Sequence, residues 1–132
     1  MSPRQQTCTR DDARRRLADA HSMMVVADLV ITDDLTPGVA GALAVLAGIA
    51  ASDAACCAVL GSRNRGQDHQ DAVTLLGSIE PNGPAMARDL RRLLSRKDDA
   101  HYGFGSLAVG EERKMVEWAH RLLRNASATL EF

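Results

Sequence analysis

Residues 35–61 read LTPGVAGALAVLAGIAASDAACCAVLG, and this stretch decides the fold. The 18 residues from position 35 to Ser52 carry no charge, which is enough length and apolar character for a membrane span. Residues 36–38, however, resemble a helix start, Asp53 interrupts the run, and Ala and Gly outnumber Leu and Ile. We therefore expect a buried helix at the centre of a helical bundle and no membrane span.

Apolar residues recur at helical spacing on both sides of this stretch. The pattern predicts helices over residues 10–32, 36–61, 68–79, 84–103 and 110–130. In the second helix, Thr36 is expected to be the cap, Pro37 the first residue and Gly61 the stop signal. Asp68 is the expected cap of the third.

The fold class follows from these helices and from composition. Only 3% of residues are aromatic and short alternating apolar runs are missing, which disfavours a β-sandwich or barrel. We expect an all-α, up-and-down bundle of about five helices, one of them short. Residues 10–130 should form a single domain after a flexible N-terminus over residues 1–9.

Cysteine use and charge exclude several classes. Neighbouring Cys56 and Cys57 rarely bond to each other, and Cys8 lies near the N-terminus, so all three are expected to be thiols. No CxxC or spaced Cys/His set suggests structural zinc, and the N-terminus lacks the apolar core of a signal peptide. We expect a cytoplasmic chain without metal or cofactor. A net charge of −1 removes any global electrostatic argument for nucleic-acid binding.

The segment most able to carry chemistry is 93–103, LLSRKDDAHYG. His101 could act as a general acid or base, with Arg96 and Lys97 as nearby cations and Asp98 as a carboxylate that orients the imidazole. Such a cluster can cleave RNA without a metal, since a base takes the ribose 2′-hydroxyl proton and a cation stabilises the charge on the phosphate. The alternative is a solvated charged face with a histidine at a helix end.

Helical geometry limits which of these residues can meet. Arg96 and His101 are separated by about 140° around a regular helix, whereas Lys97 and Asp98 lie close to His101. Arg96 could therefore join His101 only at a distorted helix end or from a second protomer.

Charged residues outside this segment have weaker signals. Arg88, Arg91 and Arg92 precede Arg96 and Lys97 in the sequence. These five residues form the densest basic patch of the chain, which could guide RNA. Asp53 is costly to bury alone, and we expect a structural pair, with cations of residues 84–103 or a helical hydroxyl as its partner. Four residues of the following loop could contact a phosphate, although capping and solvation of a turn is the commoner role: Arg63, Arg65, Asp68 and His69.

Three stretches resemble the HEPN superfamily: AACCAVLG at 54–61, GQDHQDAV at 66–73 and, above all, LSRKDDAHYG at 94–103. The resemblance covers residues 11–128 and implies a four-helix bundle with an additional short helix. Members occur as toxins with antitoxin partners, in CRISPR effectors and as stand-alone prokaryotic proteins, many without an assigned activity. Active members are metal-independent ribonucleases with an Arg-x(4 to 6)-His motif assembled across a dimer interface, which Arg96 and His101 match.

The chain departs from the active pattern at two positions. Lys97 stands where a small polar residue is usual, and Tyr102 follows His101 directly, whereas some toxins place a Tyr two residues after the His. Residues 97–103 also align with an Arg-x-x-Ala-Asp-Tyr-Gly form that resembles non-catalytic members. The resemblance therefore implies a homodimer acting on RNA, with Arg96 and His101 catalytic. We expect Lys97, Asp98, Tyr102 and Asp53 as supporting residues. The alternative is a non-catalytic module that binds a nucleotide, RNA or a protein such as an antitoxin.

Overall fold

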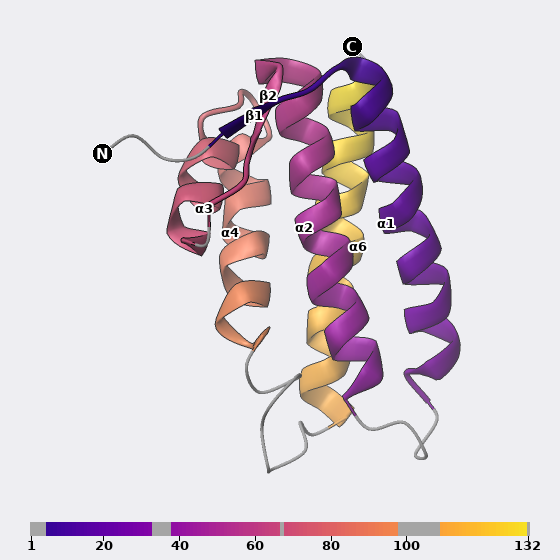
Figure 1. The fold of residues 1–132 in the computed structure, drawn as a ribbon. Coiled ribbons are helices and arrows are strands. Elements are labelled where there is room, and N and C mark those ends of the chain that lie inside the picture. The colour runs from indigo at the N-terminus through magenta and orange to yellow at the C-terminus, as the bar shows by residue number, and fades with distance from the viewer. Residues whose placement is uncertain (1–4, 33–37, 67, 98–108, 132) are drawn as a thin grey trace.

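The computed structural model describes residues 5–32, 38–66, 68–97 and 109–131 (Figure 1). Within these ranges the elements are β1 (Gln5–Thr7), α1 (Arg10–Val30), α2 (Val39–Leu60), β2 (Ser62–Asn64), α3 (His69–Gly77), α4 (Gly83–Ser95) and α6 (Val109–Leu130). The long helices run side by side along one axis, with α3 as the short one. The predicted all-α bundle is confirmed.

The apolar stretch forms the central helix, as predicted. Helix α2 packs against α1, α4 and α6, with α1 on one side and α6 behind it in Figure 1. It is long and apolar enough to cross a membrane, but 67% of its most apolar window is buried inside the bundle. Gly48 explains the close packing, because a Cβ there would lie 2.6 Å from the Leu93 side chain and 3.5 Å from that of Leu122.

Helix ends follow the expected signals in part. Gly61 ends α2 in a left-handed conformation (φ 69°), and the Asp68 side chain caps α3 by accepting from the Gln70 N–H. Thr9 caps α1 through a reciprocal pair of hydrogen bonds with Asp12. The cap of α2 is Gly38, also left-handed at φ 83°, in place of Thr36; Thr36 and Pro37 lie outside the described residues.

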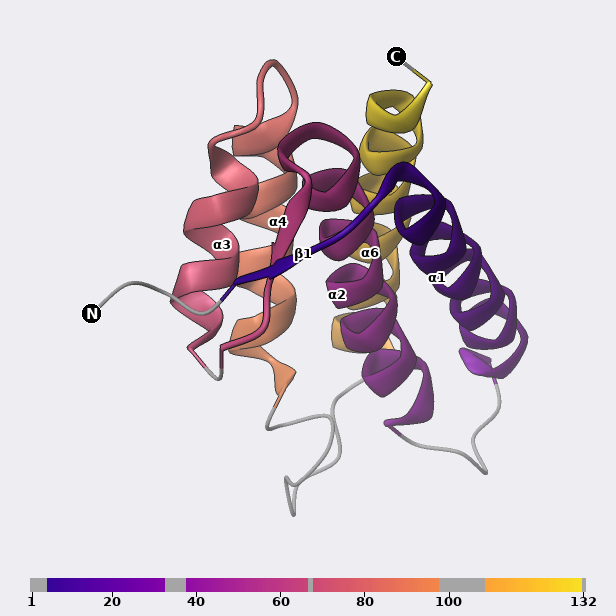
Figure 2. The same cartoon turned by 45° about the horizontal axis from the view of Figure 1, so that its top comes forward.

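The N-terminal segment differs from the flexible chain expected over residues 1–9. Residues 5–7 form β1, which pairs antiparallel with β2 in a region expected to be a polar loop, with Gln6 opposite Arg63. Figure 2 shows β1 crossing the end of the bundle in front of α2. Each strand has only three residues, so neither leaves an alternating pattern long enough to recognise.

The prediction of three thiols is wrong for two of them. Cys8 and Cys57 form a disulfide across a separation of 49 residues, and Cys56 is free and buried. The β1–β2 pairing brings Cys8 to the end of α2, where the Cys8 N–H donates to the Gly61 carbonyl at 2.9 Å. The bond depends on this long-range pairing, which the residues around Cys56 and Cys57 do not indicate.

Helix α4 ends at Ser95, well before residue 103, where its end was expected. The Arg96 N–H bonds to the Leu93 carbonyl at 3.1 Å, which tightens the last turn. The Ser95 hydroxyl also donates to the Arg92 carbonyl at 2.7 Å. Arg96 is therefore the capping residue of α4 and is not inside a regular helix.

Candidate functional site

Arg96, one of the two predicted catalytic residues, is held in an ion pair. Its Nη1 lies 2.6 Å from Glu111 Oε2 on the first turn of α6, and both side chains are about two-fifths exposed, at 39% and 41%. His101, Asp98 and Tyr102 lie outside the described residues. The predicted pairing of Arg96 with His101 therefore falls outside the described residues.

Lys97 connects the end of α4 with α3. Its Nζ lies 3.2 Å from Nε2 of His69, the first residue of α3. The predicted partnership of Lys97 with His101 falls on residues that the structure does not describe. The contact with His69 instead places Lys97 beside a hollow on the surface of the bundle.

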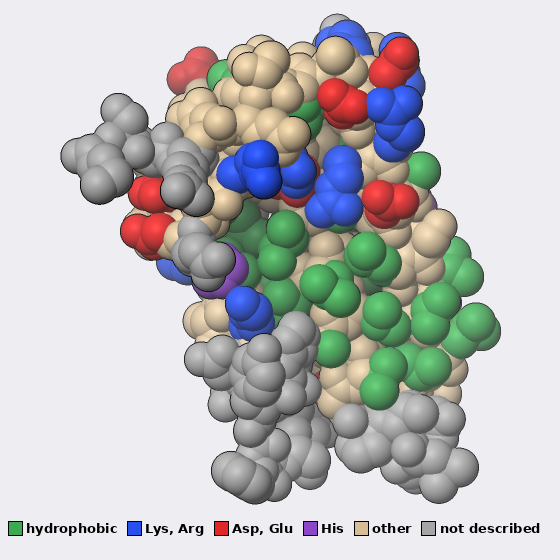
Figure 3. Space-filling view, viewed as in Figure 1, with side chains coloured by type: hydrophobic (Ala, Val, Ile, Leu, Met, Phe, Trp, Pro, Cys, Tyr) green, Lys and Arg blue, Asp and Glu red, His purple; other side chains and the backbone are tan. Residues whose placement is uncertain are grey.

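This hollow, which we call the arginine pocket, has a volume of ≈ 300 Å³ and lies between α1, α2, β2, α3 and α4. Its charged or titratable lining residues are Arg16, Asp53, Arg63, Arg65 and His69, and its apolar ones are Ile49, Ala72, Leu90 and Leu94. Figure 3 shows the hollow with cationic side chains above it and histidine and cationic groups at its lower edge. Three arginines face one carboxylate, so the pocket suits an anion.

Asp53 joins two of these arginines. Its Oδ2 accepts from Arg16 Nη2 at 3.1 Å and from Arg63 Nη1 at 2.9 Å, and only 10% of its side chain is exposed. The expected structural pair is therefore present, but the prediction that its cations come from residues 84–103 is wrong. The cations that reach Asp53 lie instead on α1 and β2, both of which also pack against α2.

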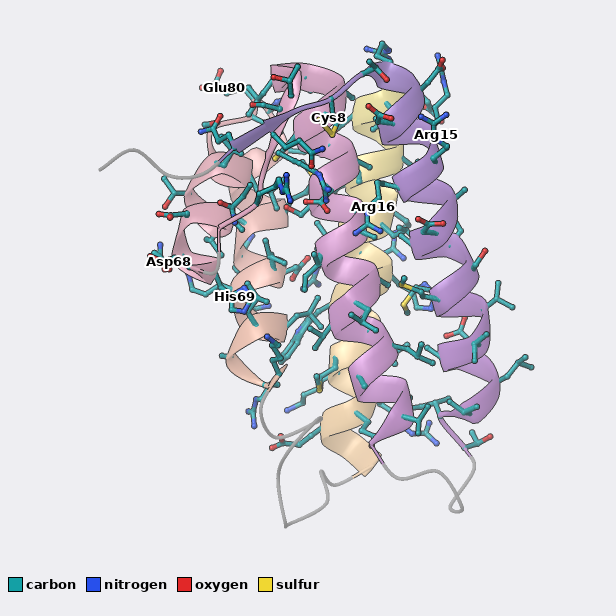
Figure 4. All side chains as sticks on the ribbon, in the orientation of Figure 1. Cys8, Arg15, Arg16, Asp68, His69 and Glu80 are labelled. Atoms are coloured by element: carbon teal, nitrogen blue, oxygen red, sulfur yellow. A yellow bond between two sulfur atoms is a disulfide. The ribbon has the colours of Figure 1, made fainter. Side chains whose placement is uncertain are left out.

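The two arginines differ in how they are held. Arg63 also donates to Gln6 Oε1 from Nε at 3.2 Å and from Nη2 at 2.8 Å, so β1 fixes its orientation. Arg16 reaches in from α1, as Figure 4 shows, and also contacts Asp19 at 3.4 Å. The buried Nε of Arg16 has no hydrogen-bond partner within the described part of the chain. A buried N–H without a partner is costly and favours an acceptor in its place.

The basic face predicted on α4 is only partly free. Arg88 and Arg91 are exposed, whereas the Arg92 guanidinium lies 5.7 Å from the centroid of the Trp118 ring. Buried Asp89 accepts from Arg121 of α6 at 2.8 and 2.7 Å, a bidentate pair that fixes α4 against α6. Asp89, the acid of this face, is therefore turned towards α6, and the exposed surface of α4 is more basic than the sequence indicates.

The sequence indicates Arg63, Arg65, Asp68 and His69 as weak phosphate candidates, of which all but Asp68 line the pocket, but it does not indicate Arg16. The signal was present in the cost of burying Asp53, which demands a cation, but nothing in the sequence linked it to α1. Among the described residues, no group of three or more His, Cys, Asp or Glu side chains could hold a metal ion.

Comparison with known proteins gives no match, either to a protein-family model or to a curated protein sequence. The functional assignment therefore depends on the geometry of the arginine pocket and the α4 end.

Proposed function

We propose that this chain is a HEPN-like domain that acts on RNA, with the arginine pocket binding phosphate and Arg96 and His101 cleaving the chain without a metal. The contact between Lys97 and His69 carries the proposal, because it joins the pocket to the segment that contains both residues of the motif. The sequence resemblance at residues 94–103 supports the same assignment.

Binding would use the two kinds of surface in the pocket. The guanidiniums that line the pocket, and Lys97, which contacts its His69, can pair with successive phosphates, which is the main source of affinity for nucleic acids. The apolar walls, to which Ile49 and Leu94 belong, can cover a ribose or the face of a base. Exposed Arg88 and Arg91 on α4 would extend the basic surface beyond the pocket.

The cleavage step would need no group from outside the chain and its substrate. His101 would take the proton of the 2′-hydroxyl, whose oxygen attacks the neighbouring phosphorus. The bond to the 5′-oxygen breaks, that oxygen takes up a proton, and a 2′,3′-cyclic phosphate remains. Arg96 would stabilise the negative charge that develops on the phosphate oxygens.

A second candidate function is binding without cleavage. The ion pair between Arg96 and Glu111 favours it, because the guanidinium is already neutralised by a carboxylate. An active enzyme would have to exchange this carboxylate for the phosphate of the substrate. In a binding module the pair would simply fix the start of α6 against the end of α4.

The test of cleavage is incubation of the purified protein with mixed RNA in EDTA. The wild type is expected to release fragments that end in a 2′,3′-cyclic phosphate, and His101→Ala and Arg96→Ala are expected to release none. His21→Ala, which removes an exposed histidine from α1, is the matched control and should cleave like the wild type. Cleavage by His101→Ala at the wild-type rate would show that the assignment of His101 is wrong.

Binding is measured separately by fluorescence anisotropy with a labelled oligoribonucleotide. Arg63→Gln should weaken binding roughly tenfold, the effect of losing one charge-assisted phosphate contact, whereas Arg14→Gln on the exposed face of α1 should change it little. Binding without any cleavage would select the second candidate. If the chain neither binds nor cleaves RNA, the proposal that it acts on RNA is refuted.

We also propose that the chain is a cytoplasmic homodimer that pairs through an apolar face on α1 and α2. Figure 3 shows hydrophobic side chains gathered over the halves of these helices nearest residues 30 and 39. Exposed hydrophobic side chains on these halves of α1 and α2 include Val26, Leu29, Val39 and Leu46. Identical faces meet in a two-fold dimer, and α2 brings no charge repulsion to such a contact because its single charged residue, Asp53, is buried and paired.

Light scattering tests the dimer. Leu29, with 72% of its surface exposed, is the most exposed member of the face. Leu29→Glu places a charge in the apolar contact and should therefore give a monomer. Leu60→Glu, at the opposite end of α2, should keep the wild-type mass. A monomeric wild type would rule out the dimer.

A further inference from the structure

We infer that the Cys8–Cys57 disulfide controls the arginine pocket, so that its reduction weakens the binding of RNA phosphate. This inference rests on the proposed function for its ligand. Its structural basis is a second surface hollow of ≈ 490 Å³, the disulfide hollow, which is lined by Cys8, Cys57, Gln6 and Asp19 among others. Arg16 and Arg63 line this hollow as well as the arginine pocket. The two guanidiniums that meet at Asp53 therefore form the wall between the disulfide and the proposed ligand.

A short series of contacts leads from the sulfur atoms to the pocket. The disulfide fixes Cys8 to α2, and the preceding three residues, β1, pair with β2. In that pairing Gln6 lies opposite Arg63 and accepts two hydrogen bonds from its guanidinium. Arg63 then donates to Asp53 inside the pocket.

Without the disulfide, β1 has little to hold it. A two-stranded pair of three residues each is marginal in water, because a few ladder bonds cannot compensate for the entropy of ordering the strand. Reduction should therefore release β1, remove Gln6 from Arg63 and leave that guanidinium free to adopt other rotamers. A side chain that must be ordered on binding contributes less affinity than one already held in place.

The chemical step requires a dithiol reductant. Cys8 is only partly buried, whereas Cys57 is 2% exposed, so the thiolate of the reductant attacks Cys8 Sγ from the disulfide hollow. The S–S bond breaks, and its electron pair leaves on Cys57 Sγ, which takes up a proton. The second thiol of the reductant then attacks the mixed disulfide and releases Cys8 as a thiol. Two electrons and two protons pass to the protein, and the dithiol becomes a disulfide.

Cys56, next to Cys57, does not compete in this exchange. It is buried, and burial, followed by the negative charge of Asp53, raises the pKa of its thiol to about 12. The thiolate is the attacking species in thiol–disulfide exchange, so Cys56 stays unreactive while Cys8 and Cys57 cycle. In the cytoplasm, where we place the chain, a disulfide of this kind is usually transient and sensitive to redox conditions.

The test compares the oxidised and the dithiothreitol-reduced full chain, with the redox state verified by mass. The probe is a fluorescein-labelled 2′-O-methyl oligouridylate of about eight nucleotides, which carries the phosphates but cannot be cleaved. Reduction should weaken binding about fivefold, the effect of roughly one net hydrogen bond. Gln6→Ala should weaken binding similarly while the disulfide stays closed.

Two serine variants form a matched pair of controls. Cys8→Ser should bind weakly with or without the reductant, whereas Cys56→Ser should respond to it like the wild type. Amide hydrogen exchange of residues 5–8 and 62–64 should speed up on reduction, independently of any ligand.

The outcomes separate this inference from the proposed function. Equal affinity of the oxidised and reduced forms, or unchanged exchange of the two strands, overturns the inference while RNA binding stands. Absence of binding in both redox states refutes the proposed function, and with it the inferred control of RNA binding.

Discussion

At the scale of single residues, Asp53 ties three elements together. One carboxylate oxygen in α2 accepts hydrogen bonds from Arg16 of α1 and Arg63 of β2. A carboxylate whose side chain is only 10% exposed is costly to bury without partners, and here two arginines pair with it. The arginine side chains are each 31% exposed, so they stay partly hydrated while they neutralise its charge. The ion pair thus stabilises the fold and also holds the cations of the arginine pocket in position.

Asp53→Asn is expected to lower the free energy of unfolding by about 2 kcal/mol, because the neutral amide leaves two guanidiniums facing each other without a charge between them. Urea denaturation measures the loss. Asp19→Asn is the matched control: it also removes a partner of Arg16, but 56% of the Asp19 side chain is exposed, so the loss should stay below about 0.5 kcal/mol. Similar losses in both variants would contradict the structural role of Asp53.

The sequence predicts that Asp53 needs a partner but not which partner it has. The cost of burying an acid in an apolar helix follows from residues 35–61 alone. Its partners lie 37 and 10 residues away along the chain, and their approach depends on the packing of α1 and on a three-residue strand. Local patterns contain no information on such long-range contacts.

At the scale of elements, the long helices were predictable because each repeats its apolar period over several turns. Helix α1 begins at Arg10, and α2 ends at Leu60 before Gly61, close to the expected bounds. The end of α4 was not predictable in this way, because residues 96–103 have no apolar stripe to extend or interrupt. A side-chain bond from Ser95 and a tightened turn at Arg96 determine where this helix stops.

Gly48 is the element-scale test of how α2 packs. Gly48→Ala should reduce the free energy of unfolding by about 1 kcal/mol. The added methyl group would overlap the buried Leu93 side chain, and the cost of this overlap exceeds the gain in helix propensity from alanine. Thermal unfolding of Gly110→Ala provides the control, because a Cβ at Gly110 meets nothing within 4 Å. That variant should match or exceed the wild type. A Gly48→Ala protein as stable as Gly110→Ala would mean that α2 and α4 are packed more loosely than described.

At the scale of the whole molecule, the arginine pocket and the apolar face of α1 and α2 lie on the same side of the bundle, as Figure 3 shows. A second copy docked on that face would therefore lie beside the pocket and bring its own basic surface near the first. The sequence predicts the bundle and the basic patch but not this common orientation, because it depends on how the helices are rotated about their axes. The α1 residues of both surfaces, Arg16 for the pocket and Leu29 for the face, lie 13 positions apart on one helix.

The disulfide is the one covalent constraint on the bundle within the described residues, and it should contribute to stability beyond its effect on the pocket. A bond that closes a loop between residues separated by 49 positions reduces the entropy of the unfolded chain, an effect of about 4 kcal/mol in the chain-entropy model. Cys8→Ser should therefore unfold at a lower urea concentration than the oxidised wild type. It should coincide with the reduced wild type, because both lack the same constraint. Cys56→Ser should retain the wild-type difference between oxidised and reduced forms. Identical unfolding midpoints for the oxidised and reduced wild type would show that the bond does not constrain the fold.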